Sequence, residues 1–297
     1  MKLRDLIERE AARLAESGVS FGHGTTNAFD EAVWLVLWSL GLPLDELDGV
    51  ADRELKPAES DAASELVARR IQERRPAAYL TQEAWLQSVP FFVDARCIIP
   101  RSLIAEHLAD GDLDDLLGHE PASVLDLCTG NGSLAVLCAM AWPQAKVVGT
   151  DISEEALAVA RINRGRHHLD ARIELLQGDG LHAVAGRRFE LIVCNPPYVN
   201  AESMASLAPE FQAEPSLALA GGVDGMDFID DLLRQAGSHL LENGWLVLEV
   251  GHERAHFEAR FAGAGGLVPL WLENSGGGDA VLALSAEDLG PWTGRPR

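Results

Sequence analysis

The chain has 297 residues, of which 47% are hydrophobic, and a formal net charge of −22. These values predict a globular protein with one large domain, or a core domain joined to a small one. The acidic balance argues against direct nucleic-acid readout, which needs stripes of Lys and Arg. No apolar run is long enough to cross a bilayer, the four cysteines form no Cys-x-x-Cys pair, and the nine histidines have no ligand spacing. We therefore expect a cytoplasmic protein with no membrane contact and no metal.

Residues 1–84 are expected to form a small helical domain. Leucines and isoleucines recur at helical spacing between Leu3 and Leu14, and again around residues 32–40. Asn27 or Asp30 is a suitable cap for the second helix, and a third helix is expected over residues 58–74. Residues 85–100 then have the pattern of a hairpin linker.

Residues 101–297 alternate between strand and helix patterns, which predicts an α/β domain built on a parallel, Rossmann-like sheet. The last two strand patterns are separated only by a Gly-rich turn, so we expect them to close a seven-stranded sheet as an antiparallel hairpin. Residues 286–297 contain Pro and Gly without periodicity and are expected to be a loose tail. The predicted strands are Ser123–Leu127, Lys146–Thr150, Arg172–Leu176, Phe189–Cys194, Trp245–Val250, Leu267–Leu272 and Asp279–Leu284.

A candidate cofactor site follows the first three of these strands. The first strand, which contains Asp126, continues into a turn with Gly130 and Gly132, where backbone can approach a ligand closely. Asp151 ends the second strand, where a carboxylate can bind ribose hydroxyls. Asp179 ends the third strand and can accept a hydrogen bond from an adenine amino group. Taken singly, Asp151 is explained as a helix cap and Asp179 as a turn residue.

Two cofactors fit this pattern. The glycine turn with Asp151 also satisfies the nicotinamide-dinucleotide fingerprint, so a dehydrogenase is an alternative. S-adenosylmethionine is favoured because the second half of the sheet is short and ends in a hairpin. An acid after the third strand also suits a single adenosine that lies across three strand ends.

The most specific motif is the tetrapeptide Asn195-Pro196-Pro197-Tyr198, which follows the apolar fourth strand. Proline ends the strand because it cannot donate to a sheet ladder. The strand end then offers an amide side chain, free carbonyl groups and an aromatic ring. Such a set suits a planar, weakly nucleophilic nitrogen, and by itself it leaves a nucleobase and an amide equally open.

Together, the glycine turn, Asp151, Asp179 and the tetrapeptide resemble class I methyltransferases that modify amide or amino nitrogens. Over nearly its full length, the chain resembles the bacterial protein-(glutamine-N5) methyltransferases, which join a small helical domain to a catalytic domain. Residues 78–85 (Ala-Tyr-Leu-Thr-Gln-Glu-Ala-Trp), 99–102 (Ile-Pro-Arg-Ser) and 214–219 (Glu-Pro-Ser-Leu-Ala-Leu) are similar to the branch that acts on large-subunit ribosomal protein L three. One departure is Gly180-Leu181, where the release-factor branch tends to carry an aromatic residue near the adenine.

This resemblance implies S-adenosylmethionine as cofactor and ribosomal protein L three as protein partner, with residues 1–84 recognising the substrate. It implies that the Asn195 side-chain oxygen and the Pro196 carbonyl accept the two N–H groups of a substrate glutamine, while Tyr198 packs on the amide. No general base is assigned, because alignment of the two reactants supplies much of the barrier reduction. The expected cofactor-binding residues are Asp126, Gly130, Gly132, Asp151, Asp179 and Asn195. The expected substrate-binding residues are Asn195, Pro196, Pro197 and Tyr198. Of these, Asn195, Pro196 and Tyr198 are also the expected catalytic residues.

Three other functions are weighed against this one. The same chemistry on release factors differs only in the protein partner. An adenine-N6 nucleic-acid methyltransferase uses the same tetrapeptide but is disfavoured by the acidic charge. A non-catalytic binding factor is disfavoured by the intact Asn195 and glycine turn. The long segment from Val199 to Gly222 is interpreted as a lid over the substrate.

Overall fold

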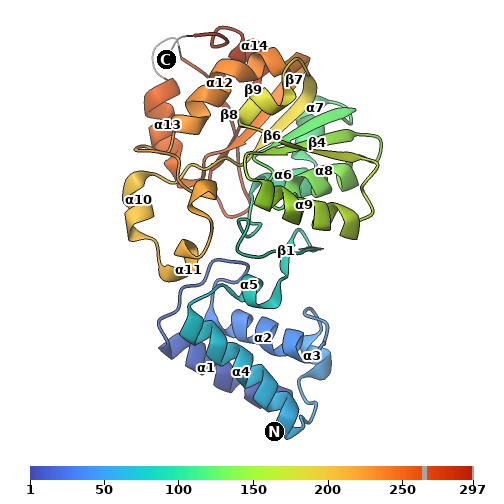
Figure 1. Cartoon of the computed structure of the whole chain (residues 1–297), viewed down its shortest axis with the longest axis vertical. Coiled ribbons are helices and arrows are strands. Elements are labelled where there is room, and N and C mark those ends of the chain that lie inside the picture. The colour runs from blue at the N-terminus through green and yellow to red at the C-terminus, as the bar shows by residue number, and fades with distance from the viewer. Residues whose placement is uncertain (263–265, 296–297) are drawn as a thin grey trace.

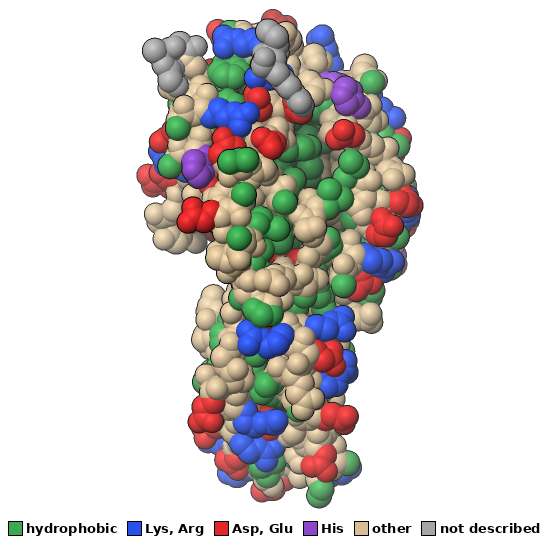
Figure 2. Space-filling view, turned by 60° about the vertical axis from the view of Figure 1, so that its left-hand side comes forward, with side chains coloured by type: hydrophobic (Ala, Val, Ile, Leu, Met, Phe, Trp, Pro, Cys, Tyr) green, Lys and Arg blue, Asp and Glu red, His purple; other side chains and the backbone are tan. Residues whose placement is uncertain are grey.

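The computed structural model describes residues 1–262 and 266–295. The chain forms two lobes, a narrow helical lobe at the N-terminal end and a wider lobe built on a sheet (Figure 1). The segment with α10 and α11 projects from the wider lobe toward the helical one. On the face drawn in Figure 2, basic and acidic side chains are interspersed rather than separated into stripes.

The helical lobe follows the predicted periodicity. The four apolar residues expected to form the core of the first helix are all buried. Asn27, not Asp30, caps the second helix, because its side-chain oxygen accepts the Asp30 N–H at 2.9 Å. The third predicted helix, α4, begins at Pro57 and ends at Glu73. The elements of this lobe are α1 (Leu3–Glu16), α2 (Ala28–Ser39), α3 (Leu47–Val50), α4 (Pro57–Glu73) and α5 (Ala77–Thr81).

A two-stranded hairpin, β1 (Ala84–Leu86) and β2 (Val89–Phe91), connects the lobes. It rests on α9 (Glu154–Arg166) through one buried side chain. The Asn163 side chain accepts the Phe92 N–H at 2.7 Å and donates to the Phe92 carbonyl at 3.0 Å. The hairpin is therefore fixed to the sheet lobe.

The wider lobe contains a seven-stranded sheet in the order β5-β4-β3-β6-β7-β9-β8, which confirms the predicted fold class. The first five strands in this order are parallel, and β9 and β8 pair antiparallel. The strands are β3 (Ser123–Leu127), β4 (Lys146–Asp151), β5 (Ile173–Gln177), β6 (Phe189–Cys194), β7 (Leu240–Glu249), β8 (Leu270–Leu272) and β9 (Val281–Ser285).

The order of the strands creates a topological switch point between β3 and β6. After β3 the chain continues outward to β4 and β5, and then returns to place β6 on the other side of β3. Ligands bind at such a point in open α/β sheets, outside the carboxyl ends of the strands. The glycine turn follows β3 and the Asn-Pro-Pro-Tyr tetrapeptide follows β6, so the switch point brings the two motifs together.

Helices cover both faces of this sheet, and alternate strand residues contribute to two separate hydrophobic clusters. On β6, for example, Ile192 and Cys194 belong to one cluster, while Leu191 and Val193 belong to the other. The remaining helical elements are α6 (Ile104–Asp110), α7 (Asp112–Leu117), α8 (Ser133–Ala141), η1 (Gly180–Val184), α10 (Ala201–Ser206), α11 (Pro209–Gln212), η2 (Ser216–Ala218), α12 (Asp227–His239), η3 (Gly251–Glu253) and α13 (Arg254–Phe261).

A third hydrophobic cluster fills the helical lobe and extends into the sheet lobe. It includes Ala156 and Val159 of α9 together with the core of α1, α2 and α4. The helical lobe is thus not a self-contained core, because one of its walls is a helix of the sheet domain.

The expectation of a loose tail after residue 285 is wrong for its first part. Residues Ala286–Leu289 form a short helix, α14, and Leu289 is fully buried. Ser285 caps it in a capping box with Asp288. A helix of one turn is too short to show an apolar period. The capping-box spacing of Ser285 and Asp288 is the feature of the sequence that indicates this helix. Residues 296–297 lie outside the described part, and within it no helix is long and apolar enough to cross a membrane.

Candidate active site

A cavity of about 270 Å³ opens at the carboxyl ends of β3, β4 and β6. The cavity is lined by every residue predicted for cofactor or substrate binding except Gly132, which lies directly behind it at the start of α8. Motifs that are up to 70 residues apart in sequence therefore form one site. The predicted residues that line it are Asp126, Gly130, Asp151, Asp179, Asn195, Pro196, Pro197 and Tyr198.

The glycine turn needs its glycines for conformation and for space. Gly130 and Gly132 have φ values of +55° and +81°, which side chains strongly disfavour. A Cβ on Gly132 would lie 3.0 Å from the Cβ of Ala160, so this glycine also allows α8 to pack closely on α9. The turn is therefore compact, with its backbone exposed to the cavity at Gly130.

Asp126 has an unpaired carboxylate oxygen inside the site. Its side chain is 1% exposed, and its Oδ2 accepts from the Thr129 hydroxyl and from the Ala135 N–H at 2.9 Å. Its Oδ1 has no hydrogen-bond partner among the residues that the structure describes. Burial raises the pKa of Asp126 to about 7, against the hydrogen bonds from Thr129 and Ala135, which lower it. A bound cationic group would pair this oxygen and favour the charged form.

Asp151 holds the turn as well as facing the cavity. Its Oδ2 accepts the Gly130 N–H and its Oδ1 accepts the Ser153 N–H, both at 2.9 Å. Burial raises its pKa, against these backbone hydrogen bonds. The helix cap of α9 is Ser153, whose hydroxyl accepts the Ala156 N–H at 3.1 Å. Each oxygen of Asp151 has a second lone pair, so these bonds leave capacity for a ligand.

Tyr198 is held at both its ring and its hydroxyl. The hydroxyl donates to Glu249 at 3.2 Å, and Glu249 accepts in turn from the Ser102 hydroxyl at 2.6 Å and the Leu103 N–H at 2.9 Å. A Cβ on Gly251 would lie 2.5 Å from the ring, so a glycine is required beneath it. Burial raises the pKa of Glu249, and burial followed by the charge of Glu249 raises that of Tyr198. This arrangement fixes the aromatic wall of the site.

Several lining residues were not predicted from the sequence as site residues. Phe228 of α12 faces the cavity beside Gly180, since a Cβ on Gly180 would lie 3.8 Å from its ring. It places an aromatic ring where Gly180-Leu181 lacks one. Arg101 and Leu217 also line the cavity, from the residues just after the linker and from the segment after the tetrapeptide. Both lie in motifs that carry the resemblance (residues 99–102 and 214–219), which could have marked them as site residues, whereas no local motif marks Phe228, which reaches the site through tertiary packing.

The fold and the cavity together define a class I methyltransferase. Residues 113–223 match the family model described as "Methyltransferase small domain". Among solved structures, the hMettl16 catalytic domain in complex with MAT2A 3'UTR hairpin 6 has a TM-score of 0.51 at 16% sequence identity, covering 77% of this chain and 81% of that one. At this level of identity the likeness concerns the fold alone.

The curated relatives are more specific. The chain is 47% identical over 300 residues to a ribosomal protein uL3 glutamine methyltransferase of Burkholderia pseudomallei, covering 97% of this chain and 95% of the relative. It is 48% identical to the protein of that name from Bordetella pertussis, with coverage of 97% and 96%. It is 42% identical to the one from Neisseria gonorrhoeae, with coverage of 97% and 95%. The chain belongs to the ribosomal protein uL3 glutamine methyltransferase family.

Proposed function

We propose that this chain transfers a methyl group from S-adenosylmethionine to the side-chain nitrogen (N5) of a glutamine in ribosomal protein uL3. The observation that carries the proposal is the meeting of two half-sites at one switch point. The glycine turn with its acidic residues lies on one side, and the Asn-Pro-Pro-Tyr tetrapeptide lies on the other. The names of the relatives support the choice of protein substrate.

The residues on the β3–β5 side fit the cofactor. The unpaired oxygen of Asp126 suits the ammonium group of the methionine moiety, because it is buried and lacks a partner. Asp151 is assigned to the ribose hydroxyls and Asp179 to the adenine amino group. Phe228 offers a ring to the adenine face. When bound, S-adenosylmethionine supplies an electrophilic methyl group on a positively charged sulfur.

The residues after β6 are assigned to the glutamine amide. The amide nitrogen is a poor nucleophile because its lone pair is delocalised into the carbonyl. The Asn195 side-chain oxygen and the Pro196 carbonyl accept its two N–H groups and orient the lone pair toward the methyl group. With the cofactor bound, its sulfonium would supply the methyl group and keep the electron pair of the sulfur–carbon bond, and water would take the proton released by the nitrogen. Orientation of this kind supplies several kcal/mol of barrier reduction.

We further propose a division of labour along the chain. Residues 1–84 recognise the protein substrate, residues 85–100 form the hairpin linker, and residues 101–297 carry out catalysis. The reaction takes place in the cytoplasm, where uL3 is available, and uses neither a metal ion nor nucleic-acid readout.

The test compares two purified protein substrates with the same labelled cofactor. We expect transfer of one methyl group to uL3 and little transfer to a peptide chain release factor, with the modified glutamine located by mass spectrometry. Preferred labelling of the release factor would reassign the partner while keeping the chemistry. Absence of transfer to either protein, with the cofactor bound, would refute the proposed function.

A further inference from the structure

The segment after the tetrapeptide, residues 199–221, is closed at its base. The Val199 N–H donates to the Leu219 carbonyl at 2.8 Å, and the Gly221 N–H donates to the Val199 carbonyl at 2.9 Å. This short bridge pins both ends of the segment beside Tyr198. The tip, which contains α11, then extends to the helical lobe (Figure 1).

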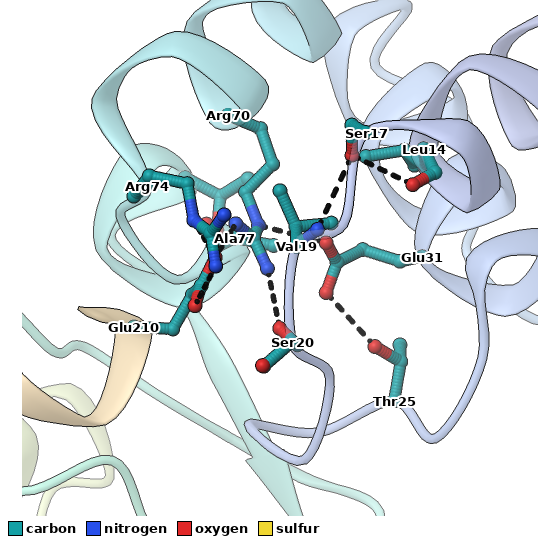
Figure 3. Close-up of polar contacts among 11 residues, drawn as sticks. Leu14, Ser17, Val19, Ser20, Thr25, Glu31, Arg70, Arg74, Ala77 and Glu210 are labelled. Carbon is teal, nitrogen blue, oxygen red and sulfur yellow. Dashed lines mark hydrogen bonds and ion pairs between the residues drawn. The ribbon is translucent and has the colours of Figure 1, made fainter. Parts of the chain in front are cut away.

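At the tip, Glu210 enters a buried ionic cluster of the helical lobe (Figure 3). Its side chain is 0% exposed and pairs with two arginines. Arg70 Nη1 donates to it at 3.2 Å and Arg74 Nη2 at 2.9 Å. Arg70 is itself held by Glu31 at 2.8 Å and by the Ser20 carbonyl at 2.8 Å. Two carboxylates and two guanidinium groups thus alternate across the contact between the lobes.

A second carboxylate of the segment, Glu214, joins two walls of the cavity. Its oxygens accept from Arg101 Nη1 and Nη2 at 2.7 and 2.8 Å, and from the Ile99 N–H at 2.9 Å. Ile99 lines the cavity from the end of the linker and Arg101 from just after it, and Leu217 lines it from the segment itself. His23 of the helical lobe lies 3.4 Å from Glu214, and its ring packs at a tilt against that of Phe211, with centroids 4.2 Å apart.

Both carboxylates are held in their charged form. Burial by itself raises the pKa of Glu210, but hydrogen bonds from Arg74 and Arg70 outweigh it and leave the pKa below its ordinary value. Burial likewise raises the pKa of Glu214, and the contacts with His23 and Arg101 lower it to about 2. Both carboxylates are therefore ionised at neutral pH, where they pair with the arginines.

We propose that Glu210 and Glu214 are positioning residues that use the helical lobe as a rigid support for the substrate wall of the active site. The wall comprises Ile99, Arg101, Leu217 and the tetrapeptide. The helical lobe then acts on the transfer step itself, beyond any part it has in recognising the substrate. This inference rests on the proposed function for the identity of the reaction.

The segment was interpreted from the sequence as a lid, and this inference gives it a different task. A lid must detach at each turnover. This segment is instead held at its base by the backbone bridge of Val199 and nearer its tip by two buried carboxylates, each with two charged or polar partners. Movement of the helical lobe would displace the substrate wall with it, because the two are joined through Glu210.

The test uses the full-length Glu210→Gln variant, which keeps the shape of the side chain and removes its charge. Glu210 does not line the cavity, so the change leaves the contacts with both reactants intact. We expect kcat with uL3 to fall at least tenfold, while the Kd for S-adenosylmethionine stays within twofold. Amide hydrogen exchange should accelerate in residues 209–219 and stay unchanged in residues 130–139.

A matched control is Asp52→Asn, which removes exposed ion pairs with Lys2 and Arg4 in the same lobe. It should leave kcat and the exchange pattern as in the natural chain. If Glu210→Gln does not fold, Arg74→Gln replaces it, since Arg74 is one-third exposed and its loss weakens the same contact. A fall in kcat of about threefold is expected there.

The outcomes separate the positioning role from its alternatives. A rise in KM with unchanged kcat would overturn the proposal, because it would make the lobe a docking surface only. Unchanged hydrogen exchange in a folded variant would overturn it as well, as would faster exchange with unchanged kcat. The exchange measurement needs no substrate. It therefore tests whether Glu210 holds the segment to the helical lobe even if uL3 proves not to be methylated.

Discussion

The two sides of the cavity are built in different ways. The side after β3 and β4 is made by residues close in sequence, in which Asp151 accepts from Gly130 and Asp126 accepts from Ala135. The side after β6 depends on residues more than 100 positions away, as in the pairing of Glu214 with Arg101. Under the proposed function, a cofactor common to many enzymes would be held by a local frame, and a particular protein substrate by a frame assembled from two lobes.

The largest expected effect is on the substrate side. Asn195→Ala removes one acceptor for the substrate amide, and we expect kcat to fall by about 10²–10³-fold, as for the loss of one oriented polar group in an active site. The Kd for S-adenosylmethionine should stay within threefold. Single-turnover transfer and calorimetry measure the two quantities. Equal loss of both would mean that Asn195 serves mainly the cofactor.

The control for this variant is Ser206→Ala. Ser206 lies at the exposed end of α10, and its hydroxyl donates within that helix, to the Ser203 carbonyl. It lies in the same segment as the substrate wall but outside the cavity. Unchanged kinetics there would show that the effect of Asn195→Ala is not a general disturbance of the segment.

The next largest effect tests the local frame on the cofactor side. Gly132→Ala places a Cβ 3.0 Å from that of Ala160 in a residue with φ of +81°. Strain and crowding together should cost about 3 kcal/mol of unfolding free energy. Gly118→Ala is the matched control, with φ of +72° and open space around it, and should cost about 1 kcal/mol.

Urea denaturation of both glycine variants measures the difference. If the two alanine variants lose equal stability, conformation alone explains the glycine turn and close packing of α8 on α9 contributes nothing. A larger loss for Gly132→Ala would support the packing argument.

The smallest effect concerns the charge of Asp126. Its pKa of about 7 in the free protein means that the carboxylate is partly protonated at neutral pH. A cationic ligand binds the deprotonated form, so the affinity for S-adenosylmethionine should rise from pH 6 to pH 7, a range in which an α-ammonium group stays protonated. Asp126→Asn should bind about tenfold more weakly at pH 7, and its Kd should not vary across this range.

Calorimetry at the two pH values tests this assignment. Asp170→Asn, which alters only an exposed ion pair with Arg164, should keep the natural pH dependence. A pH dependence that survives in Asp126→Asn would assign the titration to another group and leave the cationic part of the cofactor without its proposed partner.

The local parts of this molecule could be predicted from sequence because each carries its own pattern. Alternation of strand and helix patterns predicts the five parallel strands, though not their order in the sheet. Gly130, Gly132 and the tetrapeptide mark strand ends by their backbone requirements. Phe228 could not be predicted as a site residue, because it reaches the cavity from a helix that reads as an ordinary amphipathic element. Glu210 and Glu214 could not be predicted as interlobe contacts, because acidic residues in a loop are usually solvated.

The position of α9, a helix of the sheet lobe that contacts β4 and β5 and also packs into the core of the helical lobe, bears on how this chain folds and how it can be rebuilt. Ala156 and Val159 pack into the core of the helical lobe, on the same helix whose Asn163 fixes the connecting hairpin. Thermal unfolding should therefore follow one transition for the whole chain rather than one for each lobe. A chimera that takes the helical lobe from a relative would need that relative's outer face of α9 as well, so the unit of exchange is larger than residues 1–84.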